Sequence, residues 1–200
     1  FPFLRAIGNS LLIAVCYTLL TLVSASMAAF AFTKIQFKGS GFLLGLYLAT
    51  MMIPTQVTMI PLFVVMNQIG LINHYSSVIL PAIFRPFAVF LLVQQMRTIP
   101  PDYMDAARID GCNDVRVFFQ VILPLSKPML AAVSLFIAVG FWNDYYSYMM
   151  YIATKPTLQP FAWVLRRVLT DSAMMSQMRT GAVDIGAQLP PPMALRMATI

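Results

Sequence analysis

The run from Asn9 to Phe32 contains no charged residue and consists almost entirely of apolar and small side chains. A helix of about 20 such residues spans the hydrocarbon core of a bilayer. Across the whole chain, 60% of the residues are hydrophobic and only 10% are charged, whereas soluble domains carry roughly 25% charged residues. The sequence therefore predicts that lipid is the solvent for most of this chain.

Further apolar runs predict an all-α membrane protein, a polytopic helical bundle. The expected spans cover residues 9–32, 41–66, 76–96 and 127–151, with the start of a last span near 194–200. Pro54 and Pro61 are expected to break the second span, so that it continues as a short surface helix, and Pro81 and Pro86 favour kinks in the third. Small residues in the first span predict a face where helices approach closely: Ser24, Ala25, Ser26, Ala28, Ala29 and Ala31.

The lysines of the connectors predict the orientation in the membrane. Lys34 and Lys38 lie in the first connector, whereas the connector at residues 67–75 contains no Lys or Arg. By the positive-inside rule the first connector is cytoplasmic and the second is external. Residues 97–126 are then cytoplasmic and 152–193 form an extracytoplasmic loop, in which 158–169 are expected to form an amphipathic surface helix. Four basic residues of that loop argue against this placement without cancelling it: Lys155, Arg166, Arg167 and Arg179.

Several function classes find no support in the sequence. The 13 Lys and Arg residues, which give a formal net charge of +6, are scattered between apolar runs and form no nucleic-acid-binding stripe. Cys16 and Cys112 have neither disulfide nor metal-ligand spacing. His74 is the only histidine, so a membrane enzyme would lack the usual catalytic arrangements. No G-x-x-x-x-G-K-[ST] motif and no Gly-Lys pair occurs, so the sequence offers no P-loop for binding nucleotide phosphates.

Five residues within or beside the predicted spans are candidates for a translocation path. Arg85 lies inside the third span, where a charge is costly, so its side chain should face protein, water or an acidic partner. Packing is the alternative to substrate binding. Aromatic and polar residues near the end of the fourth span suit either a sugar path or a membrane interface; these are Trp142, Asn143, Asp144 and Tyr145.

The only dense charge cluster lies between Arg97 and Lys127 and contains four of the seven acidic residues. Pro100 and Pro101 suit a helix start, and a short helix to about Ile109 is expected. Gly111 suits the C-terminal cap of this helix, and Asn113 or Asp114 can cap a second helix that runs through Gln120 and ends before Pro124. The prediction is a helix, a tight turn and a helix, with a bare flank formed by Ala106, Ala107 and Gly111 that can enter a groove of another protein. Asp105 and Arg108, three residues apart, can fix the orientation of this element.

This segment resembles the EAA motif of ABC importer permeases. That motif reads Glu-Ala-Ala, three residues, Gly, nine residues, Ile, one residue and Leu-Pro. Here Asp105 replaces Glu and Val121 replaces Ile, and the spacing is intact. The resemblance assigns ATPase coupling to Asp105, Ala106, Ala107, Arg108, Asp110, Gly111, Leu123 and Pro124, and residues 97–126 are called the coupling segment below.

Further matches, such as Ile109-Asp110-Gly111 and Trp142-Asn143-Asp144, resemble the carbohydrate-importer branch, the relatives of the maltose permease. The resemblance implies a MetI-like, six-helix subunit of the bacterial plasma membrane, of which this chain is a fragment. It also implies no cofactor on this chain, because ATP and Mg bind to a partner ATPase dimer. The other implied partners are a second homologous permease subunit, an extracytoplasmic solute-binding protein and a carbohydrate substrate. A scaffold that only recruits the ATPase is the remaining alternative.

Overall fold

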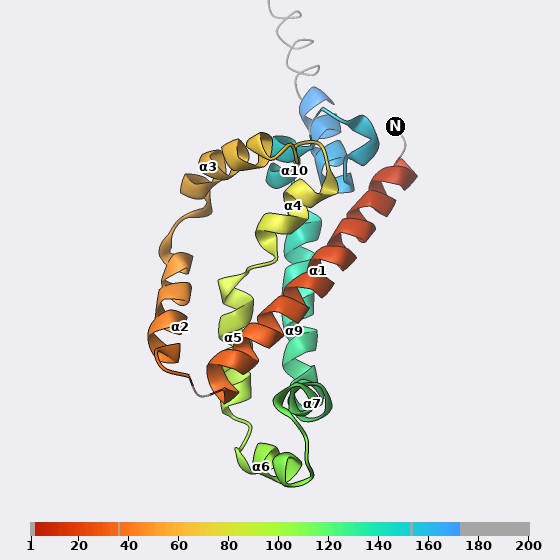
Figure 1. Cartoon of the computed structure of the whole chain (residues 1–200). Coiled ribbons are helices and arrows are strands. Elements are labelled where there is room, and N and C mark those ends of the chain that lie inside the picture. Colours follow the sequence, from red (N-terminus) through yellow and green to blue (C-terminus); the bar gives the residue numbers. More distant parts are fainter. Residues whose placement is uncertain (1–2, 36, 153, 173–200) are drawn as a thin grey trace, which may run out of the picture.

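A single long helix, α1 (Phe3–Lys34), crosses the whole bundle at an angle (Figure 1). The computed structural model describes residues 3–35, 37–152 and 154–172, and these contain helices and no strand. α1 packs against α5 (Pro86–Arg97) and α9 (Lys127–Asn143). Its buried face repeats every three or four residues and is rich in small side chains, which let the neighbouring helices approach: Ala6, Ser10, Ala14, Ala25, Ser26 and Ala29.

The remaining helices are mostly short, and several of them lie across the two ends of the bundle (Figure 1). In chain order they are α2 (Ser40–Ala49), η1 (Thr50–Met52), α3 (Thr55–Gln68), α4 (Tyr75–Ala82), α5, α6 (Asp102–Ile109), α7 (Asp114–Val117), η2 (Phe118–Ile122), α8 (Leu123–Leu125), α9, α10 (Tyr146–Tyr151) and η3 (Pro156–Leu158). Residues 161–172 are also helical, whereas the sequence predicted a helix at 158–169. Residues 173–193 of the predicted loop and the expected start of a last span at 194–200 lie outside the described residues.

Among the described residues, only α1 is long and apolar enough to cross a membrane by itself, and up to four spans result if each bent helix pair is counted as one. The pair from Ser40 to Gln68 bends by 98° at Pro54, while Pro61 lies within α3 without ending it. The pair that contains α4 and α5 bends by 44°. Pro86 begins α5, a position that its missing N–H tolerates.

The helix expected over residues 127–151 is instead two helices. α9 ends at Asn143, and Asp144 has an extended conformation. The Asp144 carboxylate then accepts hydrogen bonds from the N–H groups of Tyr146 and Ser147, at 3.0 and 3.1 Å. These bonds stabilise a new helix start, so the aromatic residues near the end of the predicted span belong to α9, a break and α10.

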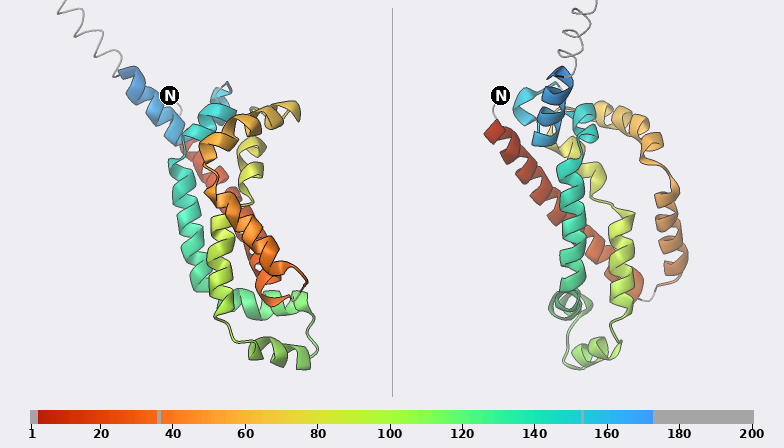
Figure 2. Two further views of the ribbon diagram at one scale, coloured as in Figure 1. Left: turned by 90° about the vertical axis from the view of Figure 1, so that its left-hand side faces the viewer. Right: turned by 180° about the vertical axis from the view of Figure 1, so that it is seen from behind.

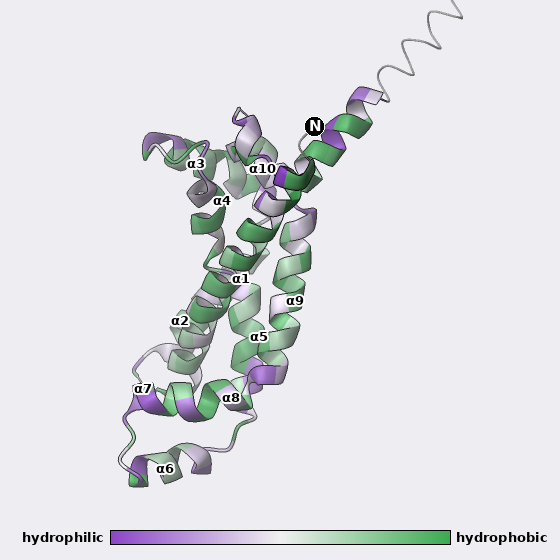
Figure 3. Ribbon diagram, turned by 90° about the vertical axis from the view of Figure 1, so that its right-hand side faces the viewer, coloured by the Kyte–Doolittle hydropathy of each residue, from purple (hydrophilic) through white to green (hydrophobic). Residues whose placement is uncertain are grey.

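Aromatic stacking joins α1 to the end of α9 in the core. Tyr17 and Phe141 are fully or almost fully buried, and their rings stack with centroids 3.8 Å apart. Tyr148 of α10 meets the same Phe141 ring edge-on at 5.9 Å. The outer faces of α1 and α9 remain apolar, while polar residues concentrate at the two ends of the bundle (Figure 3). This distribution is the one expected of a protein that is surrounded by lipid.

Candidate functional site

The coupling segment forms one end of the bundle. The helical run α7, η2 and α8 bends by 76° from α9 and lies across the base of the bundle, and α6 lies beyond it as the outermost helix (Figure 2). The segment therefore consists of a helix, a turn and a second helix, and it extends away from the apolar body.

One face of α6 packs against the rest of the protein, and the opposite face is exposed. Met104 and Ala107 are buried as part of the hydrophobic core, and α6 contacts α7 and η2. Ala106 and Ile109 are exposed, and 87% of Ile109 is accessible. The sequence grouped Ala106 and Ala107 on one bare flank, but neighbouring residues lie about 100° apart around a helix, so only Ala106 is on the free face.

Ile109 was not among the predicted site residues. No side chain of the described bundle covers it, because it lies on the opposite side of α6 from Met104 and Ala107. The signal in the sequence was its spacing, since residues 102, 105, 106 and 109 fall on one side of a helix. An isoleucine in this position adds an apolar contact to a face that otherwise carries aspartates and a small alanine.

The turn after α6 depends on Gly111. The Cys112 N–H donates to the Ala107 carbonyl at 2.9 Å, and the Gly111 N–H donates to the Arg108 carbonyl at 3.0 Å. This pair of bonds is a Schellman motif, which requires a left-handed residue at the position of Gly111. Gly111 has φ +79°, and a Cβ there would meet no atom within 4 Å. A side chain at this position would thus strain the backbone without any clash inside the chain.

Arg108 and Asn113 hold the two helices of the segment together. Arg108 Nη2 lies 3.1 Å from Asp114 Oδ1, and Arg108 Nη1 lies 3.9 Å from Asp105 Oδ1. The predicted link to Asp105 is thus the longer of the two. The Arg116 N–H donates to Asn113 Oδ1 at 2.8 Å, so Asn113, and not Asp114, caps α7. Asp110 is the C-cap residue of α6.

Pro124 does not end the second helix, contrary to the sequence prediction. A π-helical turn, η2, covers Phe118–Ile122, and helical structure continues through Pro124 to Leu125. Proline lacks the N–H of the regular ladder, and a π-turn next to it accommodates the interrupted bonding. Leu123 is partly buried and Pro124 is exposed.

A lysine joins the coupling segment to α1. Lys34 Nζ donates to the carbonyl oxygen of Ile99 at 2.7 Å. Lys34 is the last residue of α1, and Ile99 lies between α5 and α6. The first connector and the coupling segment are therefore at the same end of the bundle. In the sequence Lys34 indicates only the orientation of the chain in the membrane, and no pattern there predicts its contact with Ile99.

Three of the candidate path residues near the end of α9 make contacts within the protein. Asn143 Nδ2 donates to the Val139 carbonyl of its own helix at 2.9 Å. Asp144 accepts bonds from the first N–H groups of α10 and also from Ser147 Oγ, the latter at 2.6 Å. The Tyr145 ring lies 3.8 Å from the Arg166 guanidinium carbon. These three residues thus hold the break between α9 and α10.

Arg85 is in a different position, in the break between α4 and α5. Its guanidinium carbon lies 5.6 Å from the centroid of the Tyr17 ring. Tyr17 in turn stacks on Phe141, close to the end of α9. The structure thus connects Arg85 with the α9 end through two aromatic rings but does not gather the five candidates around one cavity.

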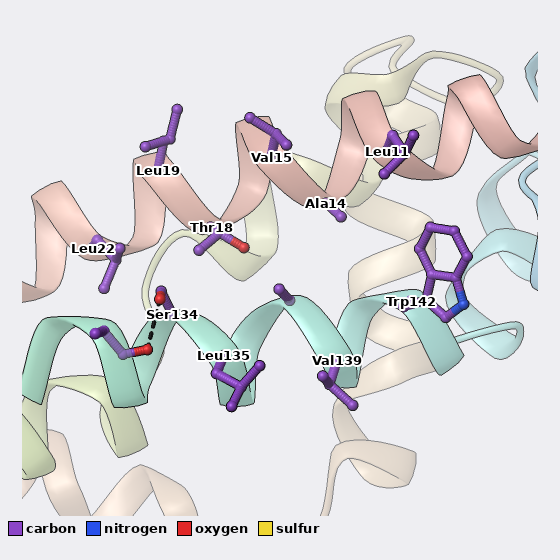
Figure 4. A pocket seen from close by; sticks show the side chains of 12 residues that line it. Leu11, Ala14, Val15, Thr18, Leu19, Leu22, Ser134, Leu135, Val139 and Trp142 are labelled. Atoms are coloured by element: carbon purple, nitrogen blue, oxygen red, sulfur yellow. Dashed lines mark hydrogen bonds between the residues drawn. The ribbon is translucent and has the colours of Figure 1, made fainter.

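A groove of about 850 Å³ lies between α1 and α9 (Figure 4). Aliphatic residues such as Leu11, Val15 and Val139 line it, and Trp142 lies at one end. A sugar needs several polar partners for its hydroxyl groups, and among the described residues that line the groove only Thr18 and Ser134 have hydroxyl side chains. The groove thus suits a helix or a lipid chain better than a saccharide.

Comparison with known proteins identifies the kind of chain. The family model described as "Binding-protein-dependent transport system inner membrane component" matches residues 20–183. The arabinooligosaccharides transport system permease protein AraQ of Halalkalibacterium halodurans is 42% identical over 138 residues, which are 69% of this chain and 50% of that protein. The polygalacturonan/rhamnogalacturonan transport system permease protein YtcP of Bacillus subtilis is 34% identical over 97% of this chain and 68% of its own length.

A solved structure has the same fold. It is the crystal structure of a bacterial ABC transporter involved in the import of the acidic polysaccharide alginate, and it matches with a TM-score of 0.74 and 25% identity over 82% of this chain and 57% of the other. The present chain thus spans only about half the length of AraQ and of the matched chain in that structure. The resemblance drawn from the sequence is confirmed: the chain belongs to the family of inner membrane components of binding-protein-dependent transport systems.

Proposed function

We propose that this chain is the multi-pass permease subunit of an ATP-binding cassette importer that moves a carbohydrate across the bacterial plasma membrane. Family membership supports the transport role, and the cargoes named for its relatives, arabinooligosaccharides, polygalacturonan or rhamnogalacturonan, and alginate, support a saccharide substrate. α1 and the three bent helix pairs support a chain that crosses the membrane more than once.

The observation that carries the coupling role is the free face of α6 at the end of the bundle that also holds Lys34. In this proposal α6 inserts into a cleft of the cytoplasmic ATPase, which binds ATP and Mg. Asp105, Ala106 and Ile109 contact the ATPase, while Ala107, Arg108, Asp110 and Gly111 keep the helix and turn in shape. Leu123 and Pro124 continue the segment into α9.

Closure of the ATPase dimer then moves α6, and the motion passes to the membrane helices along two routes. One route runs through Arg108 and Asp114 to α7 and the bend before α9. The other runs through Ile99 and Lys34 to α1. The solute-binding protein docks at the opposite end, where α3, α10 and η3 lie, and a second permease subunit completes the path.

The test uses the full-length subunit co-expressed with its cognate ATPase and compares two substitutions of equally exposed apolar residues. Ile109 and Leu4 are each 87% exposed, but they lie at opposite ends of the bundle. Burial of an isoleucine side chain stabilises a contact by about 1.5–3 kcal/mol. Ile109→Ser should therefore reduce co-purification of the ATPase by about tenfold or more, and Leu4→Ser should leave it unchanged.

Equal recovery of the ATPase with both variants would exclude the free face of α6 as its binding surface. Failure of the wild-type subunit to recover any ATPase would contradict the importer assignment itself. The melting temperature of each purified variant serves as a folding control, and neither serine should change it, because neither side chain is packed in the bundle.

A further inference from the structure

Arg85 lies near the middle of the bundle. It occupies the break between α4 and α5, which Figure 1 shows between the end with α6 and the end with α10. Its contact, Tyr17, is the fifteenth of the 32 residues of α1. At 1.5 Å per residue, Tyr17 is about 21 Å from the first residue of α1 and about 26 Å from the last. In a hydrocarbon core of about 30 Å, this position is close to the midplane.

The Arg85 charge has no carboxylate to neutralise it among residues 3–35, 37–152 and 154–172. With a limit of 4.0 Å, the ion pairs there are Arg108–Asp105, Arg108–Asp114 and Arg167–Asp171. The ring of Tyr17 attracts the cation through its π electrons but carries no charge. A cation at membrane depth usually has an anionic partner or faces a path for one. Among these residues the Arg85 guanidinium thus has the Tyr17 side chain beside it but no carboxylate.

Two of the breaks in the membrane helices, those before α5 and before α10, differ in the sign of their charge. In the break before α10, the Asp144 carboxylate binds the free N–H groups of the helix start. In the break before α5, Arg85 is the N-cap residue and no side chain caps the helix. The positive end of the α5 dipole adds to the guanidinium charge, an arrangement that broken helices of transporters use toward anionic groups. The charge at this break therefore favours an anion.

The surroundings of Arg85 are open to a ligand or a second chain. Arg85 itself is half-buried, while its neighbours Phe84 and Phe87 are 70% and 47% exposed. A planar guanidinium binds a carboxylate with two parallel hydrogen bonds, and exposed aromatic rings suit the apolar faces of a ring-shaped ligand. We propose that Arg85 binds the carboxylate of an acidic saccharide, so that the substrate class is an oligosaccharide containing uronic acid residues. This inference rests on the proposed transport function.

The test is ATP-dependent uptake into proteoliposomes that contain the complete transporter, with trigalacturonate and maltotriose as acidic and neutral probes of equal length. Arg85→Gln should reduce uptake of trigalacturonate relative to maltotriose by about tenfold or more, because hydrogen bonds between charged groups are among the strongest in proteins. Arg85→Lys, which keeps the charge, should recover most of the lost uptake. Lys38→Gln removes an exposed charge between α1 and α2 and should change neither probe.

Every other outcome would contradict either the acidic substrate or the proposed transport function on which it rests. Wild-type transporter that moves maltotriose but not trigalacturonate, or an unchanged ratio in Arg85→Gln, would overturn the acidic substrate. Equal loss of both probes in Arg85→Gln, with the permease pair no longer recovered intact, would identify Arg85 as the counter-ion of a carboxylate in the second permease subunit. Absence of ATP-dependent uptake of either probe by the wild-type complex, under conditions where it hydrolyses ATP, would instead contradict the proposed carbohydrate transport.

Discussion

The two ends of the bundle are constructed in different ways. At the end with α10, the loop before residue 161 is bonded to helices far away in the sequence: Asn9 Nδ2 donates to the carbonyls of Thr157 and Gln159, at 3.0 and 3.1 Å, and the Phe161 N–H donates to Ser10 Oγ at 2.8 Å. At the end with α6, most bonds of the turn connect residues within a few positions of each other, as between Cys112 and Ala107. One end is fixed by long-range contacts and the other by local ones.

This difference teaches how the proposed coupling segment can act as a unit. Hydrogen bonds between residues close in sequence keep the shape of α6, its turn and α7 while the segment as a whole moves. Individual contacts, such as the bond of Lys34 to Ile99, connect the segment to the membrane helices. The long-range bonds at the opposite end resist such displacement. Substitutions at each end therefore have different expected effects.

The largest effect is expected at the end with long-range bonds. Asn9→Ala removes both bonds to the carbonyls and the acceptor for the Tyr75 hydroxyl, which lies 2.9 Å from Asn9 Oδ1. Lost bonds to partly buried groups cost about 1–3 kcal/mol, so the melting temperature of the purified complex should fall by several degrees, while ATPase recovery should stay normal at low temperature.

Asn67→Ala is the matched control, because Asn67 is an exposed asparagine in α3 at the same end. It should leave the melting temperature unchanged. A similar decrease in both variants would show that the Asn9 contacts do not fix this end.

The next effect concerns the turn at the opposite end. Gly111→Val places a β-branched residue at φ +79°, which costs about 1–2 kcal/mol, and it should disrupt the Schellman bonds and reduce ATPase co-purification severalfold. Gly111→Asn should retain co-purification, because asparagine tolerates the left-handed conformation.

If Gly111→Val and Gly111→Asn reduced ATPase co-purification equally, the cause would be close approach of the ATPase at Gly111 and not the backbone geometry of the turn. Equal retention would show that the turn does not contribute to the contact. The two substitutions thus separate the shape of the segment from its contact surface.

How far the sequence predicted this fold depends on the range of the interactions. The α6 boundary, the cap at Gly111 and the break at Pro54 follow from local chemistry, and all three appear in the structure near the predicted positions. The break at Asp144 was missed because the predicted span was extended through Asn143 and Asp144 into the aromatic residues that follow, and the contact of the carboxylate with the start of α10 shows why a new helix begins there.

The sequence likewise predicted only part of the candidate site. The motif spacing located the segment, but the roles of adjacent residues depend on the helix face, which separates Ala106 from Ala107. The contacts of Lys34 with Ile99 and of Arg85 with Tyr17 join residues more than 60 positions apart. No pattern in a single sequence indicates such pairs, because packing of the assembled helices decides them.

A smaller effect is expected at the start of α7. Asn113→Ala removes the side-chain acceptor of the Arg116 N–H, and loss of an N-cap costs about 1 kcal/mol. Hydrogen exchange of the Arg116 amide should accelerate about fivefold. Asn113→Asp keeps an acceptor and should exchange at nearly the wild-type rate; acceleration equal to that of the alanine variant would contradict a capping role.

The smallest effect is expected from Arg108, because its ion pairs are exposed and such pairs contribute about 0–1 kcal/mol. A double-mutant cycle of Arg108→Gln with Asp114→Asn, read from exchange of the Cys112 amide, should give a larger coupling than the cycle with Asp105→Asn, since the pairs are separated by 3.1 and 3.9 Å. Both couplings should shrink at high salt, where exposed charges are screened. A larger coupling with Asp105 would mean that Arg108 orients α6 alone, and that local hydrogen bonds of the turn, without the ion pair to α7, make the segment a rigid unit.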